Sequence, residues 1–259
     1  MTKLQNALKN KKAFIPFITA GDPDLETTEK IIIAMAQNGA DLIEIGIPFS
    51  DPVAEGPVIA EASKRALDNG VTTDDIFAMV KKVREKVDIP LAFMTYANLL
   101  YVYGKEKFFT KCKEVDINAV IIPDIPYEEK DELLSYANAK DVALISLIAP
   151  TSKQRVAMIA KEAQGFIYLV SSLGVTGVRS EIKTDLDSIV KIIRENSDLP
   201  IGIGFGISTP EQAQKAAATA DAAIVGSAIV KMIAEYGRDA AEPVGEYVKE
   251  MKTAVIKAQ

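Results

Sequence analysis

Histidine is absent from the 259-residue chain, and this absence excludes more chemistry than any other feature of its composition. Without an imidazole the chain contains no Ser-His-Asp or Cys-His catalytic arrangement and no histidine-ligated zinc site. The single cysteine, Cys112, excludes an intramolecular disulfide and any metal site built from several cysteines. Catalysis by this chain would therefore depend on carboxylates, lysine, tyrosine or backbone dipoles.

Long apolar runs and clusters of positive charge are also missing. No stretch approaches the ~20 apolar residues that a membrane-spanning helix needs, and residues 1–14 lack the apolar core of a signal peptide. The formal net charge is -6, and the lysines and arginines are dispersed, which argues against a nucleic-acid backbone as partner. We therefore expect a cytoplasmic protein that binds neither membranes nor nucleic acids.

Short apolar runs recur along the chain, each followed by turn residues and then by an amphipathic, helical pattern. They begin at residues 14, 42, 91, 119, 143, 166, 201 and 222. Apolar strands that alternate with helices indicate a parallel sheet covered by helices. Eight such units in about 250 residues fit a (β/α)8 TIM barrel better than an open doubly wound sheet, which stays the alternative.

Two helices are predicted in addition to the repeating units, one over residues 2–12 before the first strand and one over residues 56–70 after the second strand. No linker, low-complexity tract or block of like charge marks a domain boundary. We therefore predict that residues 1–259 form a single barrel domain.

Glu44 is an acid within an otherwise apolar strand, "LIEIGIP" at residues 42–48. Because strand side chains alternate, the flanking isoleucines should face the helices, whereas Glu44 and the small Gly46 face the barrel interior. Barrel active sites lie at the carboxyl ends of the strands, and removal from water there raises a carboxyl pKa. Glu44 is thus a candidate general acid and base. Its alternative is a buried structural group paired with a cation or hydroxyl, although none of the strand runs contains a lysine or arginine.

Loops rich in proline and glycine follow several of the predicted strands. "PFSDPVAEGP" at 48–57 carries Asp51 and Glu55, either held over the barrel mouth or simply solvated. "SSLGVTG" at 171–177, "GIGFGIS" at 202–208 and "VGSAIV" at 225–230 follow strands six, seven and eight. Such glycines, with a helix beginning at Ser227, favour a phosphate site over plain tight turns.

The residues together predict a barrel enzyme that acts on a small phosphorylated substrate by carboxylate acid–base chemistry. A Schiff-base aldolase is disfavoured, because no strand end offers a lysine. Carboxylates alone do not exclude a metal, but no histidine–carboxylate ligand set exists, and we predict no metal site.

Seven motifs spread along the chain closely resemble those of tryptophan synthase alpha subunits. They are "FIPFITAGDP" (14–23), "LIEIGIPFSDPVAEGP" (42–57), "MTYANLLYVYG" (94–104), "PDIPYEE" (123–129), "YLVSSLGVTG" (168–177), "GFGISTPEQ" (204–212) and "VGSAIVK" (225–231). The resemblance implies retro-aldol cleavage of indole-3-glycerol phosphate to indole and glyceraldehyde 3-phosphate. It also implies a partner beta subunit that holds pyridoxal phosphate and converts the indole to tryptophan. The alpha subunit itself is expected to need no cofactor.

The resemblance assigns individual residues as well. Glu44 matches the family's general acid and base, and Glu55 stands where the family usually has an aspartate next to the indole N–H. The remaining matches are Phe17, Tyr96, Tyr168 and Phe205 around the indole, Thr176 in a mobile loop, Gly177, Gly206, Gly226 and Ser227 at the phosphate, and Pro48, Asp51, Asp124 and Pro126 on the partner face.

Two departures from the family pattern leave alternatives open. Glu55 is one methylene longer than aspartate, and Ser172 stands where many relatives have a loop arginine. A weakly active or regulatory alpha-like subunit, or a stand-alone lyase that releases free indole, therefore remain alternatives to the catalytic subunit.

Overall fold

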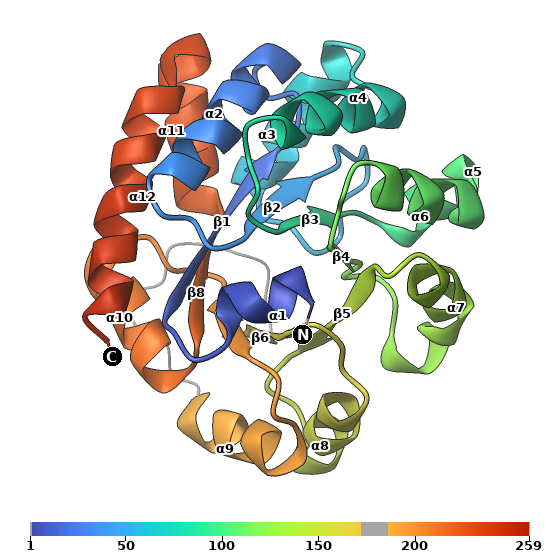
Figure 1. Cartoon of the computed structure of the whole chain (residues 1–259), viewed down its shortest axis with the longest axis vertical. Coiled ribbons are helices and arrows are strands. Elements are labelled where there is room, and N and C mark those ends of the chain that lie inside the picture. The colour runs from blue at the N-terminus through green and yellow to red at the C-terminus, as the bar shows by residue number, and fades with distance from the viewer. Residues whose placement is uncertain (1, 172–185, 259) are drawn as a thin grey trace.

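Parallel strands close into a barrel in which each strand pairs with its sequence neighbours and β8 pairs with β1 (Figure 1). The structure is a computed structural model and describes residues 2–171 and 186–258. Its strands are β1 (Ala13–Thr19), β2 (Ile43–Gly46), β3 (Leu91–Met94), β4 (Ala119–Ile121), β5 (Ala143–Ile148), β6 (Ile167–Val170), β7 (Ile201–Gly204) and β8 (Ala222–Val225). The predicted (β/α)8 barrel is confirmed, and the open doubly wound alternative is wrong.

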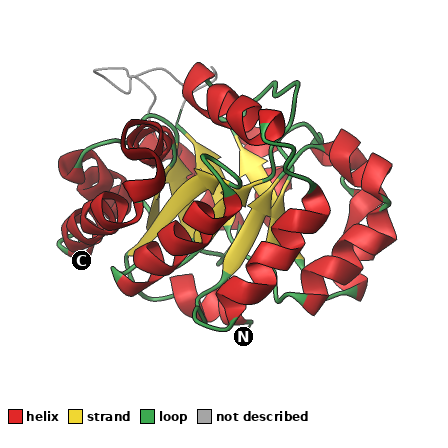
Figure 2. Cartoon of the chain, turned by 90° about the horizontal axis from the view of Figure 1, so that it is seen from above, coloured by secondary structure: helices red, strands yellow, loops and turns green. Residues whose placement is uncertain are grey.

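Helices surround the strands on the outside (Figure 2). In chain order they are α2 (Leu25–Gln37), α4 (Thr73–Arg84), α5 (Ala97–Tyr103), α6 (Lys105–Glu114), α7 (Asp131–Ala139), α8 (Lys153–Lys161), α9 (Leu186–Asn196), α10 (Pro210–Thr219), α11 (Ser227–Tyr236) and α12 (Ala241–Ile256). Short 3₁₀ turns, η1 (Tyr127–Glu129) and η2 (Gly237–Asp239), precede α7 and α12. Cys112 is fully buried in α6 as a free thiol, and burial raises its pKa, so it is a packing residue.

Both additional helices are present. α3 (Pro57–Asp68) begins with proline in the first helical turn, where its missing N–H leaves no bond unmade. α1 spans Lys3–Leu8 and starts with a capping box formed by Thr2 and Gln5. The sequence prediction of residues 2–12 was too long at its C-terminal end. The chain leaves the helix after Leu8 because Lys9 is extended, with a φ of -79° and a ψ of 137°, and Asn10 then takes a left-handed φ of 60°.

Side chains of the strands separate into two layers, as their alternation requires. Ile43, Ile45 and Ile47 belong to the cluster between barrel and helices, whereas Leu42 belongs to the interior cluster. Leu4 and Leu8 of α1 join this interior cluster and close the barrel at the amino-terminal ends of its strands. Figure 1 shows α1 lying across the strands in this region. The opposite, carboxyl end is thereby left as the open end of the barrel.

Candidate active site

A cavity of about 440 Å³ contains both candidate catalytic acids, Glu44 and Glu55. It lies at the carboxyl ends of the strands, where barrel enzymes place their catalytic groups. Six of the other predicted site residues line it, namely Phe17, Tyr168, Phe205, Gly206, Gly226 and Ser227. Thr176, Gly177 and Ser172 lie outside the described residues. The fold thus gathers residues from β1, β2, β6 and the loops after β7 and β8 around one space.

Glu44 is completely buried on β2, where backbone pairing places it between Phe17 of β1 and Ala92 of β3. Among the described residues neither of its carboxyl oxygens has a hydrogen-bond partner, so the alternative of a structurally paired acid finds no support there. Burial alone raises the pKa of Glu44 to about 8. At neutral pH the group is therefore mainly a neutral acid, able to give a proton and to take one back.

Two glycines make room for the aromatic rings next to Glu44. A Cβ atom on Gly46 would lie 2.7 Å from the Phe17 ring, and one on Gly204 would lie 2.5 Å from the Tyr168 hydroxyl. Phe17 therefore fills the space that the missing side chain of Gly46 leaves next to Glu44. Burial, with a smaller contribution from Glu44, raises the pKa of Tyr168 far above its usual value, so Tyr168 stays neutral.

Glu55 is half-buried and is held by Tyr96. The Tyr96 hydroxyl accepts the N–H of Ala54 at 3.2 Å and donates to the Glu55 carboxylate. Burial raises the pKa of Glu55 to about 7, and the hydrogen bond from Tyr96 opposes this rise because it stabilises the ionised form. Tyr96 itself is buried and stacks on Phe49 with ring centroids 5.0 Å apart. Tyr96 therefore supports Glu55 and is not among the residues lining the cavity.

Backbone donors gather at the end of the cavity formed by the loops after β7 and β8. Gly226 caps α11 without a side-chain hydrogen bond, and the first turn of α11 contains no acid. Phe205 and Gly206 have φ values of 78° and 79°, and the Ser171 hydroxyl donates to the Phe205 carbonyl at 2.7 Å. A positive φ is strained for phenylalanine, so this loop is held in an unusual shape where two predicted site residues meet the cavity. The open first-turn N–H groups of α11 suit an anion.

Sequence reasoning missed several residues that line this cavity. Pro57, Val58 and Ile59 come from the first turn of α3, and Tyr247 comes from α12 with its hydroxyl donating to the Ser208 carbonyl at 2.8 Å. Lys231 also lines the cavity. The spacing of four residues from Ser227 to Lys231 is the signal that could have identified the lysine, because it places both on one face of a helix.

The predicted partner-face residues differ in exposure. Asp51, Asp124 and Pro126 are exposed, whereas Pro48 is buried within this chain and offers little free surface. The Asp124 carboxylate also accepts the N–H of Ala97 at 3.0 Å, so it stabilises the start of α5 whatever else it binds. The exposed apolar side chains nearest to these residues in sequence include Val53, which is 70% exposed.

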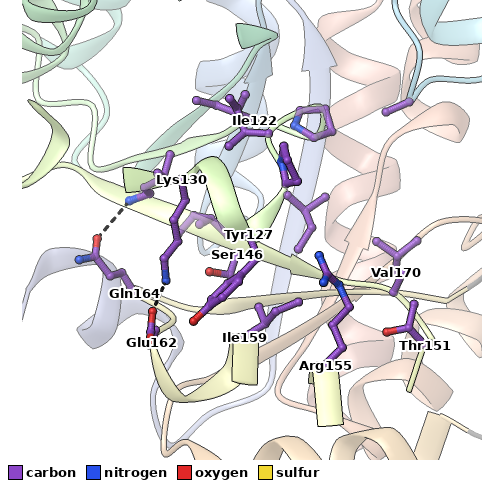
Figure 3. Close-up of a pocket in the computed structure, with 18 of the residues that line it drawn as sticks. Ile122, Tyr127, Lys130, Ser146, Thr151, Arg155, Ile159, Glu162, Gln164 and Val170 are labelled. Atoms are coloured by element: carbon purple, nitrogen blue, oxygen red, sulfur yellow. Dashed lines mark hydrogen bonds and ion pairs between the residues drawn. The ribbon is translucent and has the colours of Figure 1, made fainter. Parts of the chain in front are cut away.

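A second cavity, of about 470 Å³, lies on the side of β4 and β5 and shares Ala54 and Phe205 with the first (Figure 3). Lys130 and Glu162 form an ion pair of 2.6 Å in its wall. Arg155 also lines it and pairs with Glu128 at 2.6 Å. The cavity contains neither Glu44 nor Glu55, and both of these cations are paired. The slightly smaller cavity, which holds both acids, is therefore the candidate active site.

Within residues 2–171 and 186–258, no group of three or more side chains of the histidine, cysteine, aspartate or glutamate type is arranged to hold a metal ion. Over the same residues, none of the helices combines the length and apolarity that crossing a membrane requires.

The family model described as "Tryptophan synthase alpha chain" matches residues 4–256. The chain belongs to this family. The tryptophan synthase alpha chain of Lactiplantibacillus plantarum is 49% identical over 256 residues, which are 98% of this chain and 97% of that protein. The alpha chain of Lacticaseibacillus casei is 46% identical and covers 98% of this chain and 96% of its own length.

Solved structures of the tryptophan synthase family share the fold along nearly the whole chain. Tryptophan synthase subunit alpha from Legionella pneumophila superposes with a TM-score of 0.88 at 33% identity and covers 98% of both chains. A chain of the tryptophan synthase complex from Pyrococcus furiosus superposes with a TM-score of 0.82 at 32% identity, over 92% of this chain and 97% of that one. The family membership predicted from the sequence motifs is confirmed.

Proposed function

We propose that this chain is a tryptophan synthase alpha subunit that cleaves indole-3-glycerol phosphate into indole and glyceraldehyde 3-phosphate. The observation that carries the proposal is the fully buried, unpartnered Glu44 in one cavity with Glu55 and the open N-terminus of α11. The substrate is inferred from family membership, and the cavity contains groups suited to each part of that substrate. Family membership and the cavity therefore both support a lyase.

Glu44 acts first as the acid and then as the base. Neutral Glu44 gives its proton to indole C3, and the ring becomes an electron-poor indolenine. The bond between C3 and the glycerol carbon then breaks, and its electron pair returns to the ring. The hydroxyl on that carbon becomes the aldehyde and gives its proton to the Glu44 carboxylate, so the acid is regenerated. No net proton is consumed, which is why one carboxyl group is sufficient.

Glu55 acts on the other side of the indole. Its carboxylate accepts the indole N–H and stabilises the positive charge that develops on the ring during protonation. Tyr96 holds this carboxylate by a hydrogen bond and favours its ionised form. Glutamate therefore retains the charge that the family's aspartate supplies.

Binding residues hold the two ends of the substrate. Phe17, Tyr168 and Phe205 contact the indole, although rings in these places would also fill a barrel without a ligand. Gly206, Gly226 and Ser227 bind the phosphate, together with Gly177 from the loop outside the described residues. Thr176, from the same loop, is proposed to meet the Glu55 carboxylate. Fixing the phosphate at one end holds the reacting carbon near Glu44, and such positioning lowers the entropic part of the barrier.

The partner in this proposal is a tryptophan synthase beta subunit that receives the indole. Asp51, Asp124 and Pro126 are the proposed contact residues with free surface, and Pro48 would shape the loop beneath them. Pyridoxal phosphate would belong to the beta subunit, and the alpha subunit would need neither cofactor nor metal. We further propose a cytoplasmic protein in which residues 1–259 form one domain, supported by the single closed barrel.

Indole release from indole-3-glycerol phosphate by the purified chain, with and without beta subunit, tests the proposal. We expect turnover that rises when beta subunit is added, and loss of at least about a hundredfold in kcat in Glu44→Gln, which keeps the shape of the side chain but cannot act as an acid. Absence of turnover in both conditions would favour a regulatory subunit. Strong turnover that beta subunit does not change would favour a stand-alone lyase.

A further inference from the structure

Lys231 is the sole lysine or arginine among the described residues that line the cavity of Glu44 and Glu55. It belongs to α11, the helix whose first residue is Ser227. The glycine loops themselves supply only backbone donors and the Ser227 hydroxyl. Lys231 would therefore add a full positive charge to a phosphate site whose other proposed groups are all uncharged.

The geometry of α11 directs Lys231 toward the start of the helix. Ser227 and Lys231 are four residues apart, so they occupy one helix face, one turn apart. Helical side chains lean toward the helix N-terminus, and the four-carbon stem of lysine covers the distance of about one 5.4 Å turn. The ammonium group can thus reach the space in front of Gly226 and Ser227.

The charge of Lys231 is not neutralised by any described residue. The side chain is exposed to solvent and has no hydrogen bond, ion pair or ring contact within residues 2–171 and 186–258. The dipole of α11 favours an anion at its N-terminus, and this effect falls off beyond the first turn. Helices such as α2 and α10 place acids, Glu26 and Glu211, in their first turns, whereas the first turn of α11 contains none. An anion in the cavity would complement both the lysine and the uncapped N–H groups of α11.

We propose that Lys231 is a specificity-determining residue that binds the phosphate of the substrate and selects phosphorylated over unphosphorylated indole glycerols. The proposal rests on the function proposed above and deepens it by adding a charged contact to a site otherwise made of backbone donors. A lysine suits this place because its ammonium is a point charge that needs no fixed orientation. The ammonium group meets the anion at the open side of the cavity, while the first-turn N–H groups of α11 bind the anion from inside.

Kinetics with a matched pair of substrates test the proposal. The variants are Lys231→Met and the control Lys153→Met, which removes an exposed lysine from the first turn of α8, outside the cavity. With indole-3-glycerol phosphate, Lys231→Met should lower kcat/KM by about tenfold, the usual loss for one hydrogen bond to a charged group. The loss should appear mainly in KM, because the phosphate is remote from the reacting carbon. With unphosphorylated indoleglycerol, kcat/KM should change less than twofold.

Lys231→Arg should recover most of the lost kcat/KM, because it restores the charge. Equal values for Lys231→Met and Lys153→Met would overturn the proposal. An equal loss on both substrates would also overturn it, because that pattern indicates a general change in the shape of the site.

Binding of inorganic phosphate, measured by calorimetry on the unmodified chain and on Lys231→Met, separates this inference from the proposed reaction. The inference expects a weaker Kd in Lys231→Met by several-fold and a shallower dependence of Kd on salt concentration. If the chain binds phosphate through Lys231 but does not cleave indole-3-glycerol phosphate, the proposed reaction fails and Lys231 remains an anion-binding residue. If cleavage occurs and phosphate binding is unchanged in Lys231→Met, only the inference fails.

Discussion

Glu44 and Glu55 have raised pKa values from the same cause, burial, but they are needed in opposite protonation states. Glu44 must be neutral to protonate C3, and its pKa is about 8. Glu55 must be ionised to accept the indole N–H, and its pKa is about 7. We therefore expect kcat/KM to rise with pH as Glu55 ionises, to reach a maximum between about 7 and 8, and to fall as Glu44 ionises.

Replacing Tyr96 by phenylalanine should narrow the pH range over which kcat/KM is close to its maximum. The Tyr96 hydroxyl stabilises the Glu55 carboxylate, so its removal raises the pKa of Glu55 further above about 7. The ascending limb of the kcat/KM profile then moves to higher pH, while the descending limb, set by Glu44, stays in place. The measurement is a pH–rate profile of Tyr96→Phe. Tyr101→Phe is the control, because the Tyr101 hydroxyl pairs with Glu132 on the surface, away from the cavity. An ascending limb that does not move would show that the hydrogen bond has no influence on catalysis.

Burial of Glu44 also predicts how stability depends on pH. A carboxyl whose pKa is raised from 4.5 to about 8 keeps its proton in the folded state, whereas the unfolded chain releases it. The free energy of unfolding therefore falls between pH 4.5 and about 8 and then levels off. Glu44→Gln removes this loss and should be more stable than the unmodified chain at pH 8.5, by roughly 3 to 5 kcal/mol, and similar to it at pH 4.5.

Urea unfolding of Glu44→Gln at both pH values checks this expectation, with Glu61→Gln on the exposed side of α3 as the control. A Glu44→Gln variant that lost stability at pH 8.5 would indicate that the carboxylate has a partner in the folded protein. The same variant should be inactive, so stability and activity change in opposite directions at this residue.

α3 is an addition to the repeating strand–helix units of the barrel, and its first turn forms part of the wall of the cavity that contains Glu44 and Glu55. Its position depends on Arg65, which donates two hydrogen bonds of 2.8 Å to the Asp22 carboxylate in the loop after β1. Asp22 is only 1% exposed, and Arg65 is the cation that faces its buried carboxylate. The ion pair thus connects the loop after β1 with the helix that follows Glu55.

Arg65→Met should therefore destabilise the protein by about 2 to 4 kcal/mol, because it leaves a buried carboxylate without its cation. It should also lower kcat/KM, since Pro57, Val58 and Ile59 move with α3. Lys64→Met is a matched control on the same helix. Lys64 pairs with the exposed Asp68, and its loss should change stability by less than about 1 kcal/mol. Chemical denaturation and steady-state kinetics of both variants give the comparison, and equal effects would contradict the assignment.

In the molecule as a whole, the contacts that stabilise the fold and the candidate catalytic groups lie at opposite ends of the barrel. α1 closes the amino-terminal end with Leu4 and Leu8, which are 2% and 1% exposed. At the same end, the buried Asp41 binds Lys252 at 2.6 Å and Lys11 at 2.9 Å. The carboxyl end instead holds an uncompensated acid and a strained loop.

Leu8→Ala tests this separation. Removing a buried leucine side chain should destabilise the protein by about 2 to 5 kcal/mol. The KM and the pH profile should stay unchanged at temperatures well below unfolding, because the cavity lies at the other end. The exposed Leu67→Ala is the control for stability. A shift of the pH profile in Leu8→Ala would show that the two ends are coupled.

The sequence by itself determined the barrel, the additional helices and the inward direction of Glu44. These features follow from local periodicity, since a strand alternates every residue and a helix returns every 3.6 residues. Its motifs also determined the family and the candidate acids. A boundary such as the end of α1 was beyond this reasoning, because it depends on the backbone angles of one residue, Lys9.

Only the tertiary structure decided how these residues act together. The contact of Tyr96 with Glu55, the filling of the space above Gly46 by Phe17 and the entry of Lys231 into the cavity join residues that are far apart in the chain. Their pKa values depend on burial, and burial exists only once the barrel has closed. Periodicity records which way a side chain points, whereas its neighbours and its exposure to water are properties of the folded chain.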